Sequence, residues 1–193
     1  MSITARLKAA LTLPPPPGLL PGDLIEGSPD PHRDAAVLIA ITDREEPGVL
    51  LTVRRDDMRL HAGQVACPGG RLDPGEDSVA AALREAWEEI GLPPQSVDLW
   101  GAADPYRTIT GYAVTPILGV VPPDLNLAPH EHEVAELFEV PLSFLLDRAN
   151  QQRMSGDYKG MTRHYYQIDW DGRRVWGATA AMLVNLTTRL EAA

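Results

Sequence analysis

The sequence predicts an α/β protein in which a mixed β-sheet is flanked by helices. Short apolar runs rich in valine, isoleucine and leucine are typical of buried strands, and other segments have the composition and boundary residues of helices. Strands and helices do not alternate strictly, which favours a mixed sheet over a doubly wound parallel sheet. At 193 residues, the chain has the length of one domain with a sizeable core.

The chain begins with an expected N-terminal arm, residues 1–33, which carries a short surface helix and a polyproline stretch at 14–17. The remaining residues, 34–193, are expected to form the folded domain. Its first two strands are predicted at 35–42 and 48–54, joined across the loop DREEP, because both runs are short and strongly apolar.

A helix is predicted at 78–90, where alanine and leucine are frequent. Asp77 or Ser78 is a suitable N-cap, and Gly91, followed by two prolines, ends the helix. Later strands are predicted at 96–102, 112–121 and 132–142.

The last part of the chain is expected to contain a short helix, a hairpin and a closing helix. The short helix is predicted at 143–151, and residues 163–177 are typical of a hairpin that turns at Asp171 and Gly172. Residues 178–190 are predicted to form an amphipathic helix.

Composition and charge exclude several classes of protein. The formal net charge is -10, which disfavours non-specific binding to nucleic acid or to an anionic membrane. No segment approaches membrane-spanning length, and the first residues lack the apolar core of a secretion signal. The single cysteine, Cys67, allows no internal disulfide, so a cytoplasmic location is expected.

Three glutamates gather on the predicted helix at 78–90. Glu85, Glu88 and Glu89 are three and four positions apart, which places their Cβ atoms roughly 5–6 Å apart on one helix face. They follow a loop that contains Gly69 and Gly70. The face is either solvated, as most charge runs are, or it lines a cleft where a cation such as Mg²⁺ offsets the repulsion. The spacing alone leaves both alternatives open.

The wider pattern around these glutamates resembles the Nudix box. Gly70 is followed by five residues, Glu76, seven residues and then REAWEEIGL, from Arg84 to Leu92. The box reads G-x5-E-x7-R-E-U-x-E-E-x-G-U, where U is bulky or aliphatic, and Ala86 is the one small residue at a U position. The resemblance implies the Nudix fold, an α/β/α sandwich around a mixed sheet. It also implies hydrolysis of a diphosphate linked to another moiety, with Mg²⁺ or Mn²⁺ as cofactor.

The resemblance assigns roles to the box residues. It implies that Glu85 and Glu89 are direct metal ligands, one helical turn apart. Glu88 is either a ligand or the partner of a metal-coordinated water. The backbone carbonyl of Gly69 is expected to complete the ligand set, since glycine lets the loop fold back tightly.

Other residues near the expected metal site have supporting roles. Arg84 and Glu76 are expected to hold the loop to the helix by a salt bridge, and Trp87 is expected to pack in the core. The general base is expected from the segment PHEHEVAELFEV, with Glu133 as the first choice and Glu131 as the second. The alternative for this segment is an ordinary solvated loop.

Upstream of the box, residues 50–70 resemble the motif of the coenzyme A pyrophosphatases, L-L-T-x-R-(S/A)-x-x-(L/M)-R-x-H-x-G-Q-(V/I)-(A/S)-F-P-G-G. Arg55 departs from the motif, as does Cys67, which stands where phenylalanine is usual. Cys67 is not expected to be a nucleophile, because no base is evident nearby in sequence. The positions that agree are Leu50, Leu51, Thr52, Arg54, Met58, Arg59, His61, Gly63, Gln64, Val65, Ala66, Pro68, Gly69 and Gly70.

This second resemblance implies coenzyme A or a derivative as substrate, with 3′,5′-ADP and 4′-phosphopantetheine, or its acyl form, as products. Arg54, Arg55, Arg59 and His61 form a local basic cluster that could bind the substrate phosphates. The alternative is that some of these arginines pair with neighbouring acids such as Asp57.

Two other functions stay open at the level of sequence. One is a Nudix hydrolase that acts on ADP-ribose, NADH or a dinucleoside polyphosphate. The other is a Nudix-like module that binds a nucleotide without cleaving it, although such modules are expected to lose the box glutamates that this chain retains. The oligomeric state is also left open, and a homodimer is one of the states considered.

Overall fold

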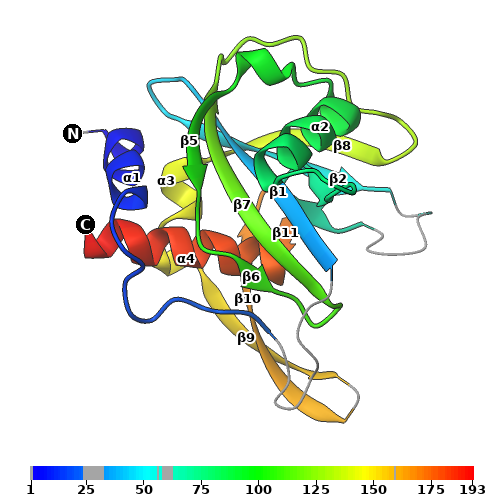
Figure 1. Ribbon diagram of the computed structural model, residues 1–193. Helices are drawn as coiled ribbons and strands as arrows, with labels where there is room; N and C mark the ends of the chain where they lie inside the picture. Colours follow the sequence, from blue (N-terminus) through cyan, green and yellow to red (C-terminus); the bar gives the residue numbers. More distant parts are fainter. Residues whose placement is uncertain (1, 24–32, 56, 58–62, 159) are drawn as a thin grey trace.

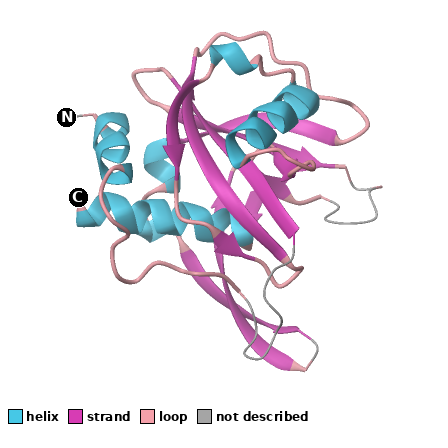
Figure 2. Ribbon diagram, viewed as in Figure 1, coloured by secondary structure: helices cyan, strands magenta, loops and turns pink. Residues whose placement is uncertain are grey.

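A computed structural model of the chain describes residues 2–23, 33–55, 57, 63–158 and 160–193. These residues form three layers, with helices on both faces of a twisted sheet (Figures 1 and 2). Helix α2 (Ser78–Ile90) covers one face, while α1 (Ile3–Leu11) and α4 (Ala178–Ala192) lie on the other. The predicted α/β/α sandwich is therefore confirmed.

The main sheet is mixed, as predicted. Its central strand β1 pairs in parallel with β7, with Arg33 opposite Tyr112 at one end and Thr42 opposite Val121 at the other. The other pairings in this sheet, among the described residues, are antiparallel. The strands are β1 (Arg33–Thr42), β2 (Gly48–Arg54), β3 (Val65–Ala66), β4 (Gly69–Arg71), β5 (Asp98–Ala102), β6 (Tyr106–Arg107), β7 (Tyr112–Val121) and β8 (Val134–Pro141).

Strand β1 is buried on both faces because its side chains alternate between two cores. Ala36, Leu38 and Ala40 pack with the alanines of α2. Ile39 and Ile41 point the other way and pack in the cluster that contains residues of α1 and α4. A continuous apolar run, rather than an alternating one, is what such a central strand requires.

Helix α2 has the boundaries that the sequence predicts. The Asp77 carboxylate accepts a hydrogen bond from the Ala80 N–H at 2.8 Å, which identifies Asp77 as the N-cap. Gly91 ends the helix with a φ of 67°, in the left-handed region that glycine adopts without steric cost. The glutamates are thus fixed on a helix with defined ends.

A second sheet was only partly predicted. The expected hairpin is present as β10 (Met161–Trp170) and β11 (Arg173–Trp176), and it turns at Asp171 and Gly172. Strand β9 (Gln152–Tyr158) pairs with β10 to complete three antiparallel strands. Residues 152–158, QRMSGDY, are polar and contain glycine, so they carry no clear strand pattern.

The expected short helix is present in two pieces. Helix α3 (Leu142–Leu145) is followed by a 3₁₀ turn, Arg148–Asn150, and another 3₁₀ turn, Pro94–Ser96, lies after α2. No helix in the described part of the chain is long and apolar enough to cross a membrane.

Helix α4 is not amphipathic, so that prediction was wrong. Nearly every residue from Thr179 to Leu190 is buried, polar ones included, because the main sheet, the second sheet and the N-terminal arm surround the helix. Its polar side chains bond to those neighbours: the Asn185 amide exchanges two hydrogen bonds with the backbone of Leu20. The helix therefore holds the arm to the domain.

The N-terminal arm contains the expected helix, α1, which buries Leu7 and Ala10. The buried Arg189 side chain pairs with Asp104 and donates to the carbonyls of Ala10 and Leu13. Whether the arm and the rest are separate units, divided at residues 33 and 34, stays a prediction.

Candidate active site

The three glutamates of α2 differ in burial. Glu89 is 5% exposed. The Glu85 side chain is 18% exposed and that of Glu88 is 55% exposed. A solvated helix face thus describes Glu88 but not the other two, which lie against the loop at Gly69 and Gly70.

Glu89 is the most deeply placed carboxylate. Its side chain accepts a hydrogen bond from the Gly69 N–H at 3.1 Å and lies 3.5 Å from the Arg54 guanidinium. Burial raises its pKa to about 7, although both of these contacts favour the charged form. Charge repulsion from Glu85 and Glu133 also raises the pKa of Glu89. A cation at this position would relieve the cost of ionising Glu89.

Glu85 lies beside Gly70, which explains why this position holds glycine. A Cβ atom at Gly70 would lie 2.3 Å from the Glu85 carboxylate, so any other residue here would displace the Glu85 side chain from its observed position. Burial raises the pKa of Glu85, and the hydrogen bond from Arg84 opposes that shift. Repulsion from Glu88 and Glu133 also raises it.

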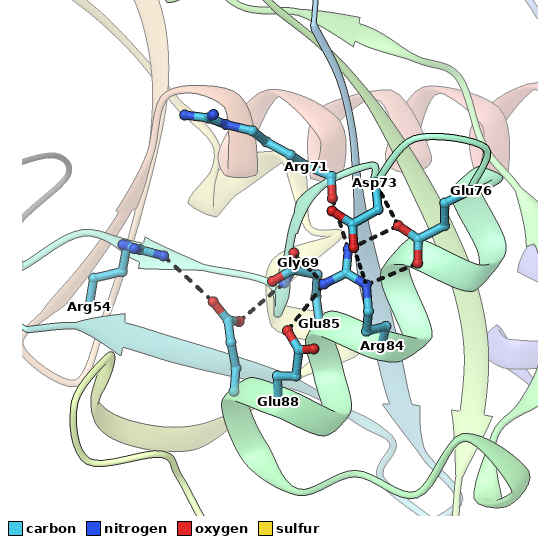
Figure 3. A network of polar contacts seen from close by, with 9 residues as sticks. Arg54, Gly69, Arg71, Asp73, Glu76, Arg84, Glu85 and Glu88 are labelled. Atoms are coloured by element: carbon cyan, nitrogen blue, oxygen red, sulfur yellow. Dashed lines mark hydrogen bonds and ion pairs between the residues drawn. The ribbon is translucent and has the colours of Figure 1, made fainter.

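Arg84 organises the loop and the helix, as the sequence predicts. Its guanidinium binds both carboxylate oxygens of Glu76 at 2.9 Å and donates to the Arg71 carbonyl at 2.9 Å (Figure 3). The same group reaches Glu85 at 2.9 Å and Glu88 at 3.1 Å. A bidentate arginine–carboxylate pair has a fixed geometry, so the loop is held rigidly against the helix.

The predicted ligand Gly69 lies next to Glu89, but through a different atom. The structure shows its N–H bonded to the Glu89 carboxylate, while the role of its carbonyl stays a prediction. An added Cβ at Gly69 would lie 2.4 Å from the Ala36 carbonyl oxygen. Strand β4 therefore lies so close to β1 here that a side chain would collide with the β1 backbone.

The carboxylates supply hard oxygen ligands of the kind that Mg²⁺ and Mn²⁺ prefer. Among the described residues, no group of three acidic, histidine or cysteine side chains is arranged to hold a metal ion. Arg84 and Arg54 instead engage the three glutamates of α2. The donor atoms and the raised pKa values of the two buried acids fit a cation site, provided that these side chains turn away from the arginines.

A cleft of about 740 Å³ borders the helix beside Glu88. The expected bases Glu133 and Glu131 both line it. Glu133 is close enough to raise the pKa of both Glu85 and Glu89, whereas Glu131 contributes to neither. Its carbonyl instead accepts from the Arg55 guanidinium at 2.8 Å. The structure brings Glu133, and not Glu131, to the buried acids.

Trp87 also lines this cleft and is 53% exposed, so the prediction that it packs in the core was wrong. The adjacent Ala86 and the Ile90 side chain occupy the buried face of α2. Trp87 therefore lies at the solvent-exposed edge of this buried face.

The predicted basic cluster is divided. Arg54 contacts Glu89, whereas Arg55 forms an ion pair with Asp57 at 2.8 Å, as the alternative reading of the sequence allowed. Arg59 and His61 lie outside the described residues. The assignment of all four to substrate binding stays a prediction.

The surroundings of Cys67, and of Glu136 in the segment of the expected base, disfavour a part in the chemistry. Cys67 is 3% exposed, and burial raises the pKa of its thiol to about 12, so it is not a nucleophile. Glu136 is paired with Arg173, whose hydrogen bonds lower the pKa of the carboxyl.

A second cavity, of about 540 Å³, borders Gly70 on its other side. It is lined by Arg33, Arg54, Arg71 and Tyr112, together with small and polar residues. No motif in the sequence marks Arg33, Arg71 or Tyr112. Arg33 and Tyr112 are neighbours only through the parallel pairing of β1 and β7.

Comparisons with known proteins agree with the fold and the box. A family model described as the NUDIX domain matches residues 31–165. A protein of Escherichia fergusonii is 43% identical over 160 residues, which cover 82% of this chain and 83% of that one. A protein of Shigella flexneri is 42% identical over 167 residues, covering 86% and 87%. This chain belongs to the Nudix hydrolase family.

Both relatives bear the name "Uncharacterized Nudix hydrolase NudL", which gives no substrate. The crystal structure of a Nudix hydrolase from M. smegmatis, RenU, is 25% identical with a TM-score of 0.52, over 63% of this chain and 79% of that one. An Ap4A hydrolase of C. elegans is 21% identical with a TM-score of 0.50, over 56% and 80%, and shows the shared fold alone.

Proposed function

We propose that this Nudix hydrolase cleaves the diphosphate bond of coenzyme A and its derivatives, giving 3′,5′-ADP and 4′-phosphopantetheine or its acyl form. The agreement of residues 50–70 with the coenzyme A pyrophosphatase motif carries this proposal. The segment lies beside the box, because Arg54 and Gln64 line the cavity that also contains Arg33, Arg71 and Tyr112, the basic cavity, and Arg54 also contacts Glu89.

The proposed cofactor is Mg²⁺ or Mn²⁺, held by Glu85 and Glu89, with Glu88 at the exposed edge and the Gly69 carbonyl as a further donor. A divalent ion there would offset the negative charge of the diphosphate and lower the pKa of a water nucleophile. Because Glu89 is buried, its ionised carboxylate is poorly hydrated, and a bound cation would stabilise the charge.

Glu133 is the proposed general base. It lies at the cleft mouth, within range of the charges on Glu85 and Glu89, and its side chain is exposed to solvent. A carboxylate in this position can accept a proton from water that attacks the diphosphate. Arg84 holds the loop against the helix through Glu76. This contact would keep the glutamates of α2 in a fixed position relative to a substrate bound beside the loop.

A substrate panel tests the proposal. The enzyme is incubated with Mg²⁺ or Mn²⁺ and coenzyme A, ADP-ribose, NADH or a dinucleoside polyphosphate, and kcat/KM is measured for each. The proposal predicts the highest kcat/KM for coenzyme A or an acyl derivative, by about tenfold or more over the other substrates. A higher value for ADP-ribose or NADH would assign a different specificity, and binding without turnover of any substrate would indicate a non-catalytic module.

A further inference from the structure

We infer that Arg33, Arg71 and Tyr112 form a binding site for a phosphate group that the enzyme does not cleave. The inference rests on the proposed function, since coenzyme A carries a 3′-phosphomonoester besides its diphosphate. The three residues line the basic cavity next to Gly70, at the end of β1 and β7.

The geometry of the three side chains is specific. The Tyr112 hydroxyl accepts a hydrogen bond from the Arg71 Nε at 2.9 Å and a longer one from Arg33 at 3.4 Å. The two guanidinium carbons lie 5.6 and 5.7 Å from the centre of the Tyr112 ring. One tyrosine thus gathers two arginines whose like charges would otherwise drive them apart.

The charges of the cavity favour an anion. Among the described residues, its lining contains Arg33, Arg54 and Arg71 and no carboxylate. Within the described part of the chain, neither Arg33 nor Arg71 forms an ion pair with an acid, although the whole protein has a net charge of -10. Burial raises the pKa of Tyr112, but the hydrogen bonds and positive charges of Arg33 and Arg71 together bring that pKa below its ordinary value.

The position of the cavity relative to the carboxylates suits an uncleaved phosphate. Gly70 lies between the cavity and the carboxylates: it lines the cavity, and a Cβ atom added to it would lie 2.3 Å from the Glu85 carboxylate. Arg54 lines the cavity and lies 3.5 Å from Glu89. In Figure 3 the Arg71 side chain points away from Arg84, while its own carbonyl accepts from Arg84. A phosphate held by Arg71 would therefore lie beside the expected metal site and outside it.

The ligand class that fits is a phosphomonoester dianion on a nucleotide. Planar guanidinium groups bind phosphate oxygens through paired hydrogen bonds. Arg71 donates through its Nε to Tyr112, and within the described residues its two terminal nitrogens have no hydrogen-bond acceptor, so they can bind a ligand. Arg55 is a weaker candidate, because Asp57 and the Glu131 carbonyl already occupy its guanidinium.

Direct binding tests the inference without requiring turnover. The affinities of 3′,5′-ADP and 5′-AMP are measured by calorimetry for the parent protein and for Arg71→Gln, Arg33→Gln and Tyr112→Phe. The parent is expected to bind 3′,5′-ADP about ten- to hundredfold more tightly than 5′-AMP, because one charge-assisted hydrogen bond contributes this ratio of affinities. Each arginine variant should lose most of that ratio, and Tyr112→Phe, which removes only the positioning hydroxyl, should lose part of it.

Arg153→Gln is the matched control, since Arg153 is an exposed arginine on β9 and carries the same charge change. It should keep the parent ratio. Thermal melting of every variant shows whether the fold is intact. A parent protein that does not distinguish the two nucleotides overturns the inference, as does an Arg71→Gln variant, folded like the parent, that keeps the full ratio.

Kinetics separates failure of this inference from failure of the proposed function. With coenzyme A and dephospho-coenzyme A as substrates, Arg71→Gln should lower kcat/KM about ten- to hundredfold for the first and change the second by less than about twofold. An equal fall for both substrates would assign Arg71 to the diphosphate or to the loop and overturn the inference. If the parent cleaves neither substrate, the proposed function fails, and the binding ratio alone still decides the phosphate site.

Discussion

At the scale of single residues, the site depends on a carboxylate that is costly to ionise. Glu89 is 5% exposed, and its pKa is raised from 4.5 to about 7. In the protein without metal, the folded state therefore holds this proton more tightly than the unfolded state does. The resulting stability is present at low pH and is lost as the pH rises from about 4.5 to about 7.

Glu89→Gln should change both turnover and the pH dependence of stability. Turnover with Mg²⁺ should fall by about two orders of magnitude or more, because a charged donor is removed from the expected metal site. The metal-free variant should be more stable than the parent above about pH 7, by about 1–3 kcal/mol, and the difference should shrink toward about pH 4.5. Chemical denaturation at several pH values measures this effect. Full turnover at saturating Mg²⁺ would remove Glu89 from the ligand set.

Two other glutamate-to-glutamine variants serve as comparisons for Glu89→Gln. Glu88→Gln should have a milder effect on turnover, since the Glu88 side chain is 55% exposed and is expected to act at the edge of the site. Glu45→Gln changes an exposed loop glutamate and should alter neither turnover nor stability by a measurable amount.

At the scale of elements, the contact between β4 and α2 sets the position of Glu85. Gly70→Ala places a Cβ atom 2.3 Å from the Glu85 carboxylate, so the side chain or the strand must move. We expect turnover to fall by about tenfold or more, because small displacements at a reacting centre are costly. Gly156→Ala is the control, since its Cβ would lie 3.6 Å from the nearest Tyr165 atom, an ordinary contact. Equal activity of the two variants would contradict the tight contact at Gly70.

The N-terminal arm is joined to α4 by a buried polar cluster. Removing one partner of a buried ion pair leaves the other charge uncompensated, so Arg189→Ala should lower the free energy of unfolding by about 3–5 kcal/mol. Arg148→Ala removes an arginine of the 3₁₀ turn Arg148–Asn150 that pairs with Glu191 of α4, but this pair is exposed and should contribute less than about 1 kcal/mol. Urea denaturation compares the two variants. Similar losses for both would mean that the Arg189 cluster does not anchor the arm.

The elements that were predictable from sequence are those with strong local patterns. Helix α2 is defined by Asp77 and Gly91, and β1 and β7 by unbroken apolar runs. Strand β9 was missed because its residues are polar. The burial of α4 was missed because Arg189 and Asn185 bond to backbone groups of the distant arm. Such partners depend on tertiary contacts that no local pattern contains.

The candidate site was predictable to a similar extent. Glu85, Glu89 and the Arg84–Glu76 pair were selected because the sequence resembles the Nudix box, and the structure places them together along one helix and its loop. Arg33 and Tyr112 are adjacent because of the register between β1 and β7, two strands nearly eighty residues apart in the chain. No local sequence pattern specifies that register.

At the scale of the whole molecule, the acidic site should couple metal binding to stability. A ligand that binds only the folded state stabilises it by about 2.7 kcal/mol at a concentration of about 100 Kd. Mg²⁺ or Mn²⁺ should therefore raise the melting temperature of the parent, and the increase should be reversed by a chelator. Glu85→Gln should lose most of the increase, whereas Glu45→Gln should keep it. An equal increase in all three proteins would indicate a metal effect located elsewhere.

The central claim is that this Nudix hydrolase splits coenzyme A at its diphosphate. It is tested most directly by incubating the protein with coenzyme A and Mg²⁺ or Mn²⁺ and identifying the products by chromatography and mass spectrometry. We predict 3′,5′-ADP and 4′-phosphopantetheine in equal amounts, formed by the parent protein and not, within detection, by Glu89→Gln. Intact coenzyme A after incubation of the folded, metal-supplied parent protein, or release of inorganic phosphate alone, would contradict the claim.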